Sequence, residues 1–178
     1  MKMDFLKRRF PDRRDTTLVF SAVMFAVFAY AARDYIYKFP SFILYFNLWD
    51  TFGVLAQYLT FALLESLLMT GLIVALAFLL PSAWLRTGFG YKGFITVLVL
   101  TAAALYLKAV MTNQPTIRFL VTTVIVSFLA WIGLLFLTRW QSFQRLLLDL
   151  ADRLTIFLYV FHPLSLLSLA VVAIRLIW

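Results

Sequence analysis

The 178-residue chain is 64% hydrophobic and has a mean hydropathy of +0.95, which excludes a soluble fold because soluble domains contain roughly 45–50% apolar residues. Its formal net charge is +8, but the basic residues stand at the ends of apolar runs and form no single patch, so we expect no nucleic-acid partner. The absence of cysteine excludes disulfides, iron–sulfur clusters and cysteine nucleophiles.

Five apolar runs are long enough to cross a bilayer as helices, which takes about 20 residues at 1.5 Å rise per residue. The runs are continuous and lack the period-2 alternation of strands. The sequence therefore predicts one all-α membrane domain over residues 1–178, with spans at 17–32, 51–80, 93–111, 117–137 and 154–178. The first run resembles a secretory signal, and we expect it to be retained as an uncleaved anchor.

Two connections between spans are predicted to be structured. The aromatic segment 35–49 is too short and too interrupted by Pro40 to be a span, so we expect it in the outer interface, with Ser41 and Asp50 as helix N-caps. Before the last span, apolar residues recur at helical spacing, which predicts an amphipathic helix on the cytoplasmic surface. These residues are Phe143, Leu146, Leu147, Leu150 and Leu154.

The distribution of lysine and arginine predicts the orientation. Of the sixteen basic residues, eleven fall on the side of the N-terminus and five on the opposite side, which places the N-terminus in the cytoplasm and the C-terminus outside. Tryptophan agrees, since four of the five lie at predicted span ends as interface anchors: Trp49, Trp84, Trp140 and Trp178. The pattern favours a multi-pass protein of the plasma (inner) membrane.

Glu65 is the polar residue that most needs an explanation, because it lies midway along the second run. A carboxylate at that depth costs a few kcal/mol or more unless it is protonated or paired. Lys108 and His162 are the ionisable residues at similar predicted depth. Glu65 is therefore either an ion or proton site, or a structural carboxyl that is paired or hydrogen-bonded to a neighbouring helix.

His162 precedes Pro163 in the last span, where the proline predicts a kink. Its imidazole could ligate a metal of a haem or chlorophyll type, but a histidine that hydrogen-bonds near its own kink is the simpler interpretation, and no second ligand accompanies it. Ser165 and Ser168 are expected to bond backbone carbonyls there. Lys108 is interpreted first as a residue that snorkels to the interface. No cofactor and no metal site is indicated.

The chain carries no motif for a catalytic site, such as a phosphate-binding loop, H-E-x-x-H or a nucleophile–base pair, so an enzyme is the least favoured of the three kinds of function. The leading hypothesis is a non-catalytic subunit or scaffold of a larger membrane protein complex, with the lipid bilayer and other membrane subunits as partners. The alternative is a small oligomeric transporter or channel that uses Glu65 with Lys108 or His162. A third is an outer-face lipid-modifying enzyme, because several charges are predicted on that side: Asp34, Lys38, Asp50, Lys108 and Arg118.

Overall fold

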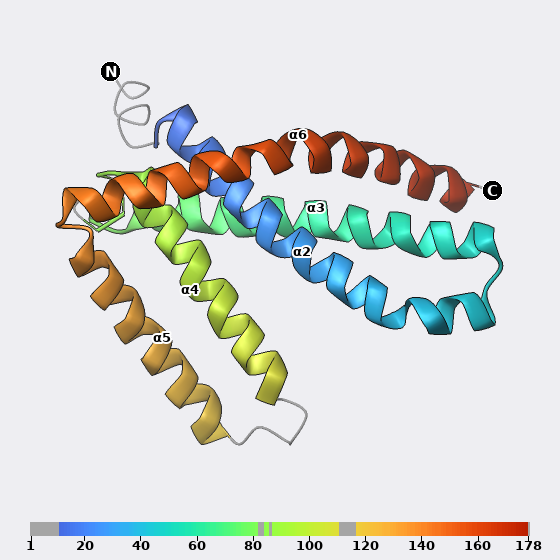
Figure 1. Cartoon of the computed structure of the whole chain (residues 1–178), viewed down its shortest axis with the longest axis horizontal. Helices are drawn as coiled ribbons and strands as arrows, with labels where there is room; N and C mark the ends of the chain where they lie inside the picture. The colour runs from blue at the N-terminus through green and yellow to red at the C-terminus, as the bar shows by residue number, and fades with distance from the viewer. Residues whose placement is uncertain (1–10, 82–83, 86, 111–116, 178) are drawn as a thin grey trace. The chain divides into compact units, whose positions relative to one another are not determined.

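The computed structural model describes residues 11–81, 84–85, 87–110 and 117–177 (Figure 1). In these residues the chain forms α2 (Arg13–Tyr45), α3 (Leu48–Leu79), α4 (Phe89–Val110), α5 (Ile117–Leu137) and α6 (Gln141–Ile177). All five of these helices are long and apolar enough to cross a membrane. The described residues therefore confirm the prediction of a helical chain with five helices of membrane-spanning length, as in a multi-pass membrane protein.

The aromatic segment after the first span is not a separate element. Helix α2 continues through Pro40 to Tyr45, because the ring of Tyr35 lies 5.7 Å from Phe39 and 5.6 Å from Phe42, on the two sides of the proline. Ser41 is therefore inside a helix, and its prediction as an N-cap is wrong.

The N-cap of α3 is also different from the prediction. The side-chain oxygen of Asn47 accepts a hydrogen bond of 2.8 Å from the backbone N–H of Asp50, which is how a capping residue satisfies a free amide of the first turn. Asp50 is therefore a first-turn residue, where its negative charge interacts favourably with the positive end of the helix dipole. The cap lies three residues before the predicted one.

The last helix joins two predicted elements. Helix α6 runs without a break from Gln141 to Ile177, so the predicted amphipathic helix and the last span are one continuous helix. Within its first part, Leu147 and Ala151 are buried, while Leu146 and Leu150 are exposed. The cytoplasmic position of this part remains a prediction.

The described chain divides into two compact units. Unit 1 comprises Met1–Val19 and Ile73–Arg153, and unit 2 comprises Phe20–Leu72 and Leu154–Trp178. The core of unit 2 is a cluster of Met24, Phe28, Ala62 and Leu63. The ring of Phe28 also stacks on that of Phe161, with 4.7 Å between centroids. Unit 2 is thus held together by apolar contacts among α2, α3 and α6.

In unit 1 a side chain packs closely on a glycine of α4, and a hydrogen bond joins α4 to α5. Gly93 of α4 lies against Val19, and a Cβ atom at Gly93 would meet that side chain at 2.5 Å, so a small residue is needed there. Helices α4 and α5 lie side by side (Figure 1). The indole N–H of Trp131 on α5 donates a 3.0 Å hydrogen bond to the hydroxyl of Thr96 on α4. This pair explains the one tryptophan that the sequence places inside a span.

Candidate functional site

Five polar residues of unit 2 line a pocket of about 260 Å³ between α2 and α3. Its wall combines two carboxylates, a carboxamide and two phenols with small and aromatic apolar residues. The lining residues are Tyr30, Ala31, Asp34, Gln57, Tyr58, Phe61, Ala62 and Glu65. Sequence reasoning found Glu65 but did not place it in a pocket with Asp34.

Two lining residues of the pocket, Asp34 and Tyr58, form a polar network with Lys38. Lys38 lies 2.7 Å from Asp34, and the hydroxyl of Tyr58 donates a 2.9 Å hydrogen bond to the same carboxylate oxygen. The ammonium group of Lys38 donates to the Tyr58 hydroxyl at 3.1 Å. Asp34 and Lys38 stand one helical turn apart on α2, whereas Tyr58 comes from α3. The network neutralises the Asp34 charge and ties the two helices together.

Glu65 lies midway along α3, roughly 20–25 Å from either helix end at 1.5 Å per residue. It is exposed in the structure, and it shares one face of α3 with four other exposed residues. We call this face the α3 stripe, which consists of Gln57, Phe61, Glu65, Leu68 and Leu72. These positions fall within one narrow sector of the helix because they recur at intervals of three and four residues. The stripe borders the pocket and carries two polar side chains among large apolar ones.

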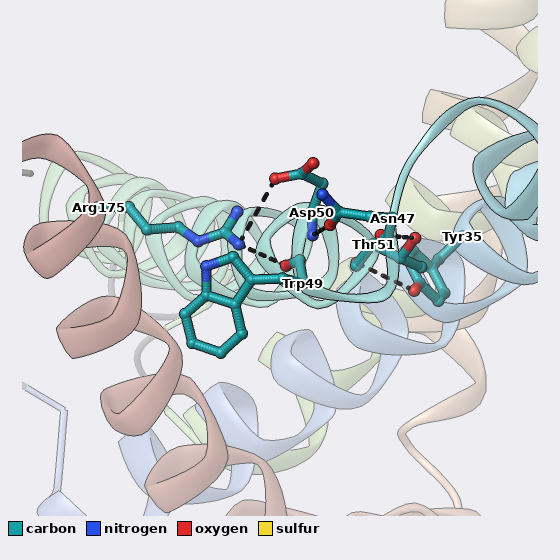
Figure 2. Close-up of polar contacts among 6 residues, drawn as sticks. All are labelled: Tyr35, Asn47, Trp49, Asp50, Thr51 and Arg175. Atoms are coloured by element: carbon teal, nitrogen blue, oxygen red, sulfur yellow. Dashed lines mark hydrogen bonds and ion pairs between the residues drawn. The ribbon is translucent and has the colours of Figure 1, made fainter.

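A second polar cluster joins the end of α6 to the start of α3 (Figure 2). The guanidinium of Arg175 donates a hydrogen bond to the backbone carbonyl of Trp49, lies 3.8 Å from a carboxylate oxygen of Asp50 and stands 5.1 Å from the centroid of the Trp49 ring. Gly53 makes room for it, because a Cβ atom there would overlap the guanidinium. Beside this cluster, the Tyr35 hydroxyl donates to the carbonyl of Thr51 at 3.3 Å.

Sequence reasoning missed the Arg175 cluster. Arg175 and Trp49 are 126 positions apart, and the only signal was an arginine in the last turn of an apolar helix. The cluster has the features of a structural clamp, since the guanidinium joins the end of α6 to the start of α3 through a hydrogen bond, an ion pair and a ring contact. It also accounts for Asp50, which had been grouped with the predicted outer-face charges.

The other two intramembrane candidates are not among the residues that line the pocket. His162 is an exposed residue of α6 in unit 2, and Lys108 is an exposed residue of α4 in unit 1. The pairing of Glu65 with either residue stays a prediction. Ser165 and Ser168 donate hydrogen bonds to the carbonyls of Phe161 and Leu164, so both bond to backbone as expected, but neither bonds to the carbonyl of Tyr159, which Pro163 leaves without its helical donor.

The tryptophans predicted as interface anchors are exposed where the structure describes them. Trp49 is 69% exposed, Trp84 45% and Trp140 71%, while Trp178 lies outside the described residues. Large exposed indoles at helix ends suit a headgroup environment. Their role as anchors remains a prediction.

The described residues include no group of three or more histidine, aspartate or glutamate side chains placed to hold a metal ion. The chain matches no known protein family, and no curated protein and no solved structure is significantly similar to it.

Proposed function

We propose that the chain is a non-catalytic subunit or scaffold of a larger membrane protein complex, and that the α3 stripe contacts a neighbouring subunit. The observation that carries this proposal is the exposure of Glu65 midway along a helix of membrane-spanning length. A surface that faced only lipid would leave this carboxyl in hydrocarbon. A surface covered by another helix would give it a partner.

The energetic cost of a charge in hydrocarbon favours the second environment. Insertion scales put a charged side chain at the centre of a span at about 2.5–3.5 kcal/mol, and Gln57 adds a second polar group to the same face. The middle of α5 provides the contrast: its exposed residues Val121, Val124, Ile125 and Phe128 are apolar and suit lipid without a partner. The α3 stripe therefore differs from an ordinary lipid-facing surface.

The partner surface should carry a lysine, an arginine or a hydrogen-bond donor at the depth of Glu65, flanked by apolar residues that pack on Phe61 and Leu68. Helix association in membranes depends on packing and on interhelical hydrogen bonds. Phe61 and Leu68, which are 65% and 74% exposed, provide the packing surface. Glu65 provides the hydrogen bond or ion pair.

Site-directed photo-crosslinking in native membranes tests the proposal. A photo-reactive residue at Phe61 should join the tagged chain to a second, different protein in comparable amount, and the same residue at Val124, which is 66% exposed on α5, serves as the matched control. Glu65→Leu should reduce co-purification of that partner more than Glu65→Gln, which keeps a hydrogen-bonding side chain. Purification as a lone monomer, with no protein crosslinked at Phe61, would contradict the proposal.

A second candidate is a small oligomeric transporter or channel, with the pocket as part of a cation or proton pathway. It is favoured by one observation: Glu65 and Asp34 line the same pocket, together with two tyrosines. In this case a crosslink at Phe61 would join two copies of the same chain. Glu65→Gln should then change flux and its pH dependence in proteoliposomes, and unchanged flux would rule this function out.

The proposed setting is a plasma (inner) membrane with the N-terminus in the cytoplasm. It is supported by the excess of basic residues on that side.

An outer-face lipid-modifying enzyme has less support from the geometry. Of its five charges, Asp34 and Lys38 neutralise one another and Asp50 lies beside Arg175, while Lys108 and Arg118 belong to unit 1.

A further inference from the structure

Helices α4 and α5 of unit 1 border a groove of about 770 Å³, a volume within the range of roughly 300–1,000 Å³ that is usual for sites of small molecules. Small residues of both helices keep it open, among them Ala102 and Ala103 on α4 and Ser127 and Ala130 on α5. The groove is long and predominantly apolar.

The groove follows most of the length of α5. Its lining extends from Arg118 to Leu134, roughly 24 Å at 1.5 Å rise per residue, which compares with a hydrocarbon core of about 30 Å. At the Arg118 end the rings of Tyr106 and Phe119 lie 5.6 Å apart. Toward the other end the hydrogen bond between Trp131 and Thr96 holds the helices together. The groove thus has an elongated apolar body and one aromatic mouth.

The mouth of the groove is positively charged. Arg118 is exposed, lines the groove and is the second residue of α5, where the helix dipole adds partial positive charge. The sequence contains no aspartate or glutamate between Glu65 and Asp149, so neither α4 nor α5 offers a carboxylate to this arginine. An anionic ligand would complement the charge.

We propose that this groove binds an anionic phospholipid, with one acyl chain along the small residues of α4 and α5 and the phosphate against Arg118. Over a length of roughly 24 Å, the volume of about 770 Å³ corresponds to a mean cross-section of roughly 32 Å², which suits an acyl chain better than a helix, whose diameter with side chains is about 10 Å. A zwitterionic lipid of the same chains would supply the apolar contacts without the net negative charge. The inference is independent of the proposed complex, because it concerns unit 1 and not the α3 stripe.

Native mass spectrometry of the full chain tests the charge requirement. The detergent-purified protein would be mixed with equal amounts of dioleoyl phosphatidylglycerol and dioleoyl phosphatidylcholine, which differ in headgroup only. We expect about tenfold preferential retention of phosphatidylglycerol, on the order of one charge-assisted hydrogen bond. Arg118→Gln should reduce the preference to within about twofold, and Arg118→Lys should keep most of it. Arg139→Gln removes an equal charge at the other end of α5 and should leave the preference unchanged.

A second pair of variants tests the groove itself. Ala103→Leu places a larger side chain in the lining, whereas Ala104→Leu adds the same bulk at an exposed position outside it. We expect Ala103→Leu to lower retention of both lipids severalfold and Ala104→Leu to have no effect. Equal retention of the two lipids by the wild type, an unchanged preference in Arg118→Gln, or unchanged retention in Ala103→Leu would overturn the proposal. Loss of a dimer instead of a lipid in Ala103→Leu would also overturn it, by assigning the groove to a second copy of the chain.

Discussion

Replacing Arg175 by methionine is expected to lower the free energy of unfolding by about 2 kcal/mol, taking the smaller values for its charge-assisted hydrogen bond and its contact with the Trp49 ring. The hydrogen bond to the Trp49 carbonyl provides most of this. The ion pair with Asp50 adds only a few tenths, because its 3.8 Å separation and the 48% exposure of the Asp50 side chain weaken it. Methionine keeps most of the apolar stem, so the loss should come from the guanidinium.

The assay is reversible unfolding in mixed micelles, followed by circular dichroism as denaturing detergent is added. Arg139→Met is the control, because the guanidinium of Arg139 lies 4.3 Å from the Phe136 ring and should cost no more than roughly 1 kcal/mol when removed. Gly53→Ala should reproduce part of the Arg175→Met effect, since the new methyl group would displace the guanidinium. If the free energy of unfolding of Arg175→Met lay within about 0.5 kcal/mol of the wild-type value, the clamp would be refuted as a source of stability.

Three further results are expected. Tyr58→Phe removes the hydroxyl that bridges α2 and α3 and should cost about 1 kcal/mol in the same assay; no loss would mean that the network is not formed in the membrane. Trp131→Phe removes the hydrogen bond to Thr96 and should lower the free energy of unfolding by a similar amount. An unfolding free energy equal to that of the wild type would contradict this expectation. Because the chain has no cysteine, single cysteines can report topology: one at Phe46 should react with an impermeant maleimide in intact cells, and one at Ser142 only after permeabilisation, whereas the reverse pattern would invert the orientation.

The helices could be predicted from the sequence because membrane-spanning segments are long apolar runs, and α5 has the predicted bounds of 117–137. The ends of the helices were harder to predict, because a helix end is indicated only by a few neighbouring residues, whose effect other contacts can override. Pro40 indicates a break only if nothing else supports the helix, and the rings around Tyr35 supply that support. In the same way, the apolar spacing of 143–154 predicted a helix but not its continuation into the last span.

The candidate site was predictable only in part. Glu65 is visible in the sequence because a carboxyl within an apolar run is unusual, and Asp34 and Lys38 are at a spacing that favours a pair on a helix. Tyr58 joins that pair from another helix, and Arg175 reaches Trp49 across most of the chain. Contacts of this kind depend on how helices pack, which hydrophobic periodicity in one sequence does not specify.

The continuity of α2 through Pro40 has a consequence for the depth of that helix in the bilayer. A proline has no N–H, so the carbonyl of Ile36, one turn earlier, receives no helical hydrogen bond from position 40. Ile36 is 69% exposed, and hydrocarbon offers no donor to such a carbonyl. We expect water or a lipid headgroup to supply this donor, which agrees with the prediction that residues 35–49 lie in the outer interface although α2 is one continuous helix.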